Sequence, residues 1–143
     1  MRWFTHLGGA RATLATGLAL LPFGGPTARL GLTLLLANIV SHAAVQVLKR
    51  TFVRARPCDA AGRPLALVDL PDPFSFPSGH TAAATAVATS VAIAQPVLAP
   101  LVIPLAALVG YSRVHLRVHH VSDVLAGAAL GLAGAIVATK LLG

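Results

Sequence analysis

The chain has 143 residues, of which 56% are hydrophobic and 10% are charged, and its mean hydropathy is +0.80. These values exclude an ordinary soluble domain, and the length suits one membrane-embedded domain over residues 1–143 with about five crossings of the bilayer. The formal net charge is +7. We attribute the excess of basic residues to the cytoplasmic flanks of membrane helices and to an anion-binding site, so we expect no nucleic-acid partner. The single cysteine, Cys58, excludes an internal disulfide and a cysteine-based metal cluster.

Five apolar stretches predict an all-α, polytopic transmembrane bundle of about five helices. They cover residues 7–22, 28–48, 78–95, 97–112 and 121–142. The first stretch is short for a spanning helix, and we interpret it as a membrane helix, not a cleaved signal peptide, because a second apolar run follows almost at once. In the last stretch, Gly127, Gly131 and Gly134 recur on roughly one face, which predicts close helix packing.

A long polar stretch, residues 56–76, separates the second and third expected helices. It exceeds the usual length of a connection, which favours a lid or a substrate-facing loop. Its acidic residues are interpreted as solvated loop charges: Asp59, Asp69 and Asp72. Trp3 and Phe4 near the start of the chain, and Phe74 and Phe76 before the third helix, fit the belt of aromatic residues at a membrane interface. For Phe74 and Phe76, contact with a lipid chain is the alternative.

Polar residues collect at helix ends that share one side of the membrane if five helices alternate in direction. The residues are Lys49, Arg56, Ser78, Gly79, His80, Arg113, His119 and Asp123. Two arginines and a lysine can neutralise a phosphate, the arginines through bidentate hydrogen bonds. We place Pro77 in the first turn of the third helix, where Ser78 and Gly79 would offer a hydroxyl and backbone N–H groups to phosphate oxygens.

His119 and Asp123 are four residues apart, which places them on one face of a helix. A carboxylate behind a histidine fixes its tautomer and leaves the other ring nitrogen free to attack phosphorus. His80 comes from a different helix and would donate a proton to the leaving-group oxygen. The residues therefore predict a nucleophile and an acid on separate histidines.

Three spaced motifs carry a family resemblance. They are Lys49 with Arg56 and Pro57, then Pro77 to His80, then Ser112 and Arg113 with His119 and Asp123. The pattern resembles the type 2 phosphatidic acid phosphatase (PAP2) superfamily, over about residues 38–130. The resemblance implies that His119 forms a phosphohistidine with help from Asp123, that His80 protonates the leaving group, and that no metal or other cofactor is needed. It also implies phosphate binding by five residues: Lys49, Arg56, Ser78, Gly79 and Arg113.

Other polar residues receive different interpretations. Ser112 and Arg54 are accessory site candidates, although Arg50 and Arg54 also suit lipid anchors. His42, with Asn38 and Gln46 nearby, is expected to make interhelical hydrogen bonds. Structural or solvated roles are expected for His6, His42, His115 and His120. The third motif departs from many relatives in residues that would tune substrate choice: His115, Arg117 and His120.

The predicted function is a metal-independent integral-membrane phosphatase of lipid phosphates, with membrane lipids as its surroundings. Phosphatidic acid, phosphatidylglycerol phosphate, polyprenyl phosphate or diphosphate and lipid A phosphates all stay open as substrates. The alternatives are a soluble vanadium-dependent haloperoxidase, which the apolar helices exclude, and a non-catalytic anion-binding protein or transporter, which would not need both histidines and Asp123. A monomer and a homo-oligomer both stay open.

The expected location is the bacterial inner membrane, with several crossings. The excess of Arg on the motif-bearing side favours a cytoplasmic site under the positive-inside rule, whereas many bacterial relatives face outward. The sequence therefore leaves the side of the active site open.

Overall fold

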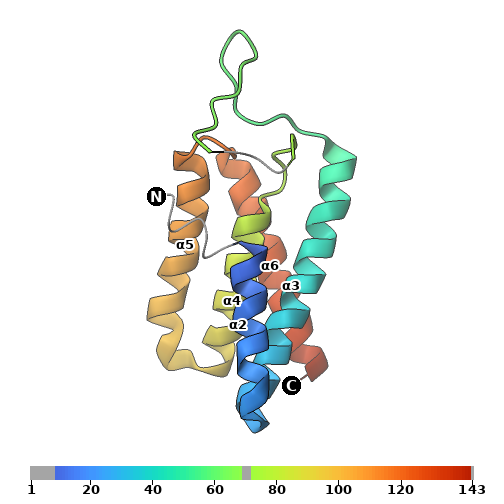
Figure 1. The fold of residues 1–143 in the computed structure, drawn as a ribbon, viewed down its shortest axis with the longest axis vertical. Coiled ribbons are helices and arrows are strands. Elements are labelled where there is room, and N and C mark those ends of the chain that lie inside the picture. Colours follow the sequence, from blue (N-terminus) through green and yellow to red (C-terminus); the bar gives the residue numbers. More distant parts are fainter. Residues whose placement is uncertain (1–8, 69–71, 143) are drawn as a thin grey trace.

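The computed structural model describes residues 9–68 and 72–142, and Figure 1 shows them as an upright bundle of helices below one long loop. The α-helices of the described residues are α2 (Ala10–Leu20), α3 (Gly25–Phe52), α4 (Gly79–Ala94), α5 (Ala99–His115) and α6 (Val121–Leu142). Two short 3-10 turns, η1 (Leu21–Phe23) and η2 (Pro96–Leu98), join α2 to α3 and α4 to α5. The predicted all-α bundle of about five helices is confirmed.

Local sequence explains where these helices begin and end. Ser78 is the N-cap of α4, and its side-chain oxygen accepts the N–H of Thr81. Pro77 therefore precedes the cap, and our placement of Pro77 in the first helical turn was wrong. Gly24 has a φ of 68° between η1 and α3, a left-handed conformation that glycine adopts without steric cost.

Three helical segments are long and apolar enough to cross a membrane: Gly25–Phe52, Pro96–His115 and Val121–Leu142. By contrast, α2 has 11 residues and α4 has 16, which at 1.5 Å per residue gives α4 a length of about 24 Å. The short α4 packs against α3, α5 and α6 at the centre of the bundle. The chain is a multi-pass membrane protein whose shortest core helix is enclosed by longer ones.

The bundle buries mainly small residues and exposes many of its large apolar residues. Its buried core includes Ala37, Ala86 and Ala135, whereas Leu125 and Ile39 are more than half exposed. This distribution suits lipid, because membrane helices associate through close packing and not through expulsion of water.

The glycine face of α6 makes the closest helix contacts. A Cβ on Gly127 would meet the carbonyl of Ser78, the N-cap of α4, and one on Gly134 would lie 2.8 Å from the carbonyl oxygen of Ala37 in α3. The close packing expected for these glycines is present.

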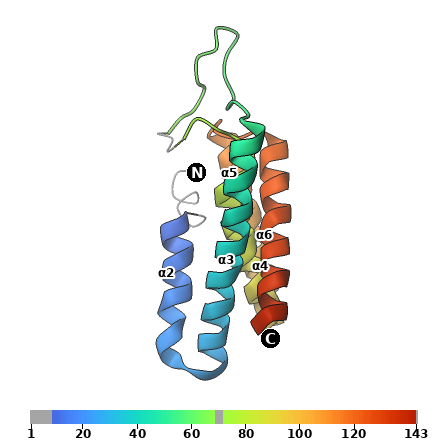
Figure 2. The ribbon, with the colours of Figure 1, turned by 90° about the vertical axis from the view of Figure 1, so that its right-hand side faces the viewer.

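Alternating helix directions bring four helix ends together. The end of α3, the start of α4, the end of α5 and the start of α6 lie at the end of the bundle that carries the long loop (Figure 1). The turned view shows η1 and the C-terminal end of α6 at the opposite end (Figure 2). Motif residues from distant parts of the sequence therefore share one end of the molecule.

Candidate active site

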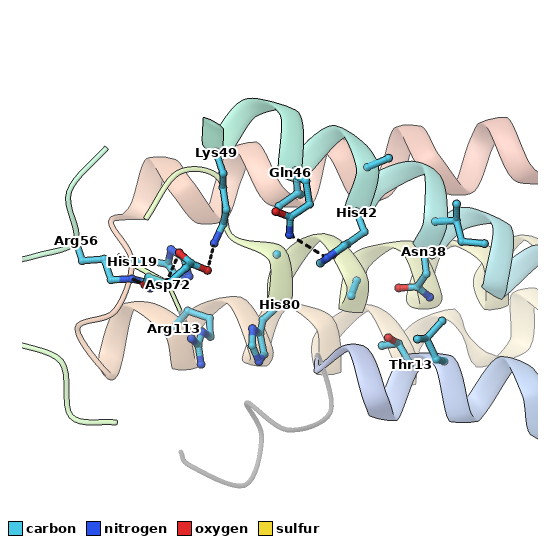
Figure 3. Close-up of a pocket in the computed structure, with 16 residues that line it drawn as sticks. Thr13, Asn38, His42, Gln46, Lys49, Arg56, Asp72, His80, Arg113 and His119 are labelled. Atoms are coloured by element: carbon cyan, nitrogen blue, oxygen red, sulfur yellow. Dashed lines mark hydrogen bonds and ion pairs between the residues drawn. The ribbon is translucent and has the colours of Figure 1, made fainter. Parts of the chain in front are cut away.

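Three buried cations from separate segments line one cavity. Lys49 lies in the last turn of α3, Arg56 in the following loop and Arg113 in the last turn of α5, and each residue is less than a tenth exposed. The cavity has a volume of about 620 Å³ and is also lined by Gly79, His80 and His119 (Figure 3). Six of the predicted site residues are thus brought together, and the cations among them make the cavity suitable for an anion.

The start of α4 supplies Gly79 and His80 to this cavity. Ser78 is fully buried, and its oxygen accepts the hydroxyl of Thr81 at 2.9 Å besides capping the helix. Ser78 does not appear among the residues that line the cavity. Its observed role is to begin α4, which directs the N-terminal end of the helix and its partial positive charge toward the site.

Asp123 lies in the first turn of α6, but His119 lies two residues before the helix begins. The prediction that both residues occupy one face of a helix was therefore wrong, although the two side chains do meet. Nδ1 of His119 is 3.6 Å from Oδ2 of Asp123, and both side chains are buried. This separation is an ion-pair distance but is longer than a hydrogen bond. Oδ2 instead accepts the backbone N–H of His120 at 2.8 Å, so Asp123 also closes the first turn of α6 from within.

Burial is the main cause of a lowered pKa for the His119 imidazole, and the charges of Arg56 and Arg113 act in the same direction. Asp123 opposes this effect and raises the pKa in part. Neutral imidazole is the form that can act as a nucleophile, because the protonated ring has no free lone pair. The surroundings of His119 therefore favour its reactive form.

The accessory candidates Arg54 and Ser112 lie outside the lining of the cavity. Nη1 of Arg54 donates to Oδ1 of Asp123 at 2.8 Å and to the hydroxyl of Ser122 at 2.7 Å. Ser112 is fully buried, and its hydroxyl donates to the carbonyl of Val109 at 2.6 Å. Arg54 thus contacts the catalytic candidate Asp123, while Ser112 bonds within its own helix.

Asp72 is not a solvated loop charge, and that interpretation was wrong. Its Oδ2 lies 2.8 Å from Nζ of Lys49, and its Oδ1 lies 3.2 Å from Nη2 of Arg56. Figure 3 shows the carboxylate of Asp72 with its bonds to Lys49 and Arg56. Burial by itself would raise the pKa of Asp72, but hydrogen bonding to Lys49 and the charges of Lys49 and Arg56 outweigh it, so the pKa is lowered and the carboxylate stays ionised.

The remaining acidic loop residues differ from Asp72. Asp59 forms an ion pair with the exposed side chain of Arg63 at 2.8 Å, and neither residue lines the cavity. Asp69 lies outside the described residues, as do His6, Trp3 and Phe4. Phe76 packs edge-on against Phe52, with ring centroids 5.4 Å apart.

Polar residues of α3 were assigned to interhelical hydrogen bonds, and the structure corrects this. Gln46 pairs with His42 at 3.1 Å, and Asn38 donates to the carbonyl of Leu34 at 3.0 Å, so both bonds run within α3. Asn38, His42 and Gln46 instead line the cavity. Their spacing of four residues places them on one helix face, which runs along the cavity from Lys49 through Gln46 and His42 to Asn38 (Figure 3).

The rest of the cavity lining is largely apolar. It is formed by Leu14, Ile39, Ala43, Val45 and Ala83, and Thr13 of α2 adds a polar group. One continuous space therefore joins a cationic end at the helix termini to an apolar region between helices. Sequence reasoning missed α2 as part of this wall, since no motif lies in it.

The other histidines and basic residues near the third motif lie outside the cavity lining. His115 is exposed at the end of α5, 5.9 Å from Tyr111 between ring centroids. Arg117 has a φ of 55° in the tight connection between α5 and α6. Their contribution to substrate choice stays a prediction.

Comparisons with known proteins agree with this geometry. The model of the PAP2 superfamily matches residues 27–143. Undecaprenyl-diphosphatase of Sulfolobus acidocaldarius is 32% identical over 106 residues, which make up 73% of this chain and 52% of that protein. The chain therefore spans about half the length of this curated relative.

Two solved structures share the fold. One is a transmembrane PAP2 type phosphatidylglycerolphosphate phosphatase from Bacillus subtilis, with a TM-score of 0.77, 30% identity, and coverage of 98% of this chain and 73% of that chain. The other is Aquifex aeolicus LpxE, with a TM-score of 0.78, 28% identity, and coverage of 97% and 82%. The matched family model, the fold and the three motifs lead to one conclusion: the chain belongs to the PAP2 superfamily.

Proposed function

We propose that this protein is an integral-membrane phosphatase that hydrolyses a lipid phosphate monoester or diphosphate through a phosphohistidine on His119. The observation that carries the proposal is the single cavity that places Lys49, Arg56, Arg113, His80 and His119 at one end and apolar residues at the other. A phosphate would bind among the cations while an acyl or prenyl chain occupies the apolar region. The named substrates of the relatives, undecaprenyl diphosphate and phosphatidylglycerol phosphate, have this amphiphilic form.

The first chemical step forms a bond between Nε2 of His119 and phosphorus. The bond from phosphorus to the lipid oxygen breaks, and His80 gives that oxygen a proton. Asp123 orients the His119 ring and stabilises the positive charge that develops on it. The separation of 3.6 Å between Nδ1 and Oδ2 must shorten by about half an ångström for a hydrogen bond, which commonly happens when substrate binds.

The second step releases inorganic phosphate. His80, now neutral, takes a proton from water, and the water oxygen attacks phosphorus as the bond to His119 breaks. The side chains of Lys49, Arg56 and Arg113 stabilise the charge on the transferring phosphoryl group in both steps. Three cations supply this stabilisation, so the proposed chemistry calls for no metal.

Replacing His119 tests this proposal directly. His119→Ala should abolish phosphate release from detergent-solubilised lipid phosphates, because no nucleophile remains. His115→Ala is the matched control, since this exposed histidine lies at the same end of the bundle but outside the cavity lining. Phosphate release that survives His119→Ala in correctly folded protein would refute the phosphohistidine mechanism. A wild-type protein that releases no phosphate would instead favour the non-catalytic anion-binding role.

A panel of substrates would define the lipid. Phosphatidic acid, phosphatidylglycerol phosphate, polyprenyl phosphate and polyprenyl diphosphate should be compared with glycerol 3-phosphate, which has no apolar chain. The apolar wall of the cavity predicts that one or more lipid phosphates have a much higher kcat/KM than glycerol 3-phosphate. Equal values would contradict the lipid part of the proposal.

A further inference from the structure

The Asp72 carboxylate bridges two of the cations expected to bind phosphate. Oδ2 accepts from Nζ of Lys49 at 2.8 Å and Oδ1 accepts from Nη2 of Arg56 at 3.2 Å. The same arginine also donates from Nε to the backbone carbonyl of Asp72 at 3.1 Å. One loop residue thus contacts cations from α3 and from the start of the long loop.

Asp72 is itself held in place. Oδ1 also accepts the backbone N–H of Phe74 at 3.0 Å, a local turn typical of aspartate. The chain then continues alongside residues 54–56: the N–H of Ser75 donates to the carbonyl of Arg54 at 2.8 Å, and its hydroxyl donates to the carbonyl of Ala55 at 2.9 Å. The carboxylate is therefore part of a built connection between the two sides of the loop.

The cations keep donors for a substrate despite these bonds. Lysine has three N–H donors and arginine has five. The contacts of Lys49 are to Asp72 and, at 3.5 Å, to the carbonyl of Phe74. The contacts of Arg56 are two to Asp72 and one, at 2.8 Å, to the carbonyl of Val118. Lys49 therefore uses two of its three donors, and Arg56 uses three of its five. One donor on Lys49 and two on Arg56 stay available for a substrate.

We propose that Asp72 is a positioning residue for phosphoryl transfer: it holds Lys49 and Arg56 so that their remaining donors point at the transferring phosphoryl group. This inference rests on the proposed phosphatase function. A long lysine side chain without such a partner has many rotamers, and fixing it beforehand removes an entropic cost from the transition state. The opposite role is a carboxylate that occupies the phosphate position and competes with substrate.

Steady-state kinetics of Asp72→Asn and Asp72→Ala separate these roles. If Asp72 positions the cations, kcat should fall at least about tenfold in both variants, because a misplacement of about 1 Å can cost about a hundredfold, while KM should change less than about threefold or decrease. If Asp72 competes with substrate, KM should fall and kcat should stay within about threefold of the wild-type value, and that result would overturn the proposal.

Controls separate this inference from folding and from the function on which it depends. Asp59→Asn removes another loop aspartate that pairs with an arginine, Arg63, away from the cavity, and it should leave kcat unchanged. All variants are assayed well below the lowest melting temperature, with kcat expressed per folded protein. A wild-type protein that releases no phosphate from any lipid would refute the proposed function, whereas an active wild type with unchanged kcat in Asp72→Asn would refute only the positioning role.

Discussion

Substituting Gly127 by alanine tests whether the contact between α4 and α6 sets the geometry of the site. In an ordinary exposed helix this change would stabilise the protein by about 1 kcal/mol through helix propensity. Here an added Cβ would lie less than 3.0 Å from the carbonyl oxygen of Ser78, a separation that Cβ atoms in proteins essentially never show. It would also lie 3.3 Å from Cβ of Thr81. The oxygen belongs to the backbone of the residue that caps α4, so a side-chain rotation cannot relieve the contact.

The magnitude follows from this clash. Moving the two helices apart by roughly half an ångström would relieve it, at a cost typical of overpacking, about 1–3 kcal/mol. The same movement would stretch the bond of 2.9 Å between the N–H of Ser78 and the carbonyl of Asp123. It would also separate His80 on α4 from His119 before α6. Because a displacement of about 1 Å can lower the rate about a hundredfold, we expect kcat/KM to fall on the order of tenfold.

Gly134→Ala supplies the matched control on the same helix. Its Cβ would lie 2.8 Å from the backbone oxygen of Ala37, so it creates a similar clash two turns farther from the site. Both variants should melt at a lower temperature, but only Gly127→Ala should lose activity per folded protein in a phosphate-release assay. Equal kcat/KM values for Gly127→Ala and the wild type would refute the argument that this helix contact sets catalytic geometry.

Three further predictions address the site. Burial and nearby cations lower the pKa of His119, so the neutral nucleophile should persist as the pH falls, and the acid limb of kcat/KM should have its midpoint below 6.5; a midpoint above 6.5 would contradict this assignment. Arg54→Ala should lower kcat with little change in KM, because Arg54 contacts Asp123 and does not line the cavity; a selective rise in KM would instead show substrate contact. Cys58 is exposed in the loop at the site end, so a membrane-impermeant maleimide should label it only after permeabilisation if the site is cytoplasmic, and labelling of intact cells would place it outside.

The sequence was sufficient to predict which motif residues share one end of the bundle. The motifs lie at helix ends, and successive membrane helices alternate in direction. Lys49 lies in the last turn of α3, His80 in the first turn of α4 and Arg113 in the last turn of α5. Any bundle with this chain order places them at one end. The contact between His119 and Asp123 was also predicted, although His119 lies before α6 and the helical spacing used for that prediction does not apply. The shared placement of the motifs depends on local periodicity and on the order of helices, both of which can be read from one chain.

The contacts of loop residues could not be predicted in the same way. Asp72 meets Lys49 across 23 residues and Arg54 meets Asp123 across 69, and both contacts depend on how the long loop closes over the bundle. No periodicity governs that closure. The direction of the Ser78 hydroxyl could not be predicted either, because a serine at the start of a helix can cap the helix or bind an anion. Its contact with Thr81 shows that Ser78 caps the helix here.

Asp123 joins the fold to the proposed chemistry through several bonds at once. Its carboxylate accepts from the backbone of His120, which ends the tight connection carrying His119. Its carbonyl accepts the N–H of Ser78 at 2.9 Å, which ties the start of α6 to the cap of α4. The proposed nucleophile, His119, and the end of α4 that lines the cavity are therefore connected through one residue. Because a main-chain bond must break before α4 and α6 can separate at this point, the site keeps its geometry in a bundle held together mainly by small residues and close packing.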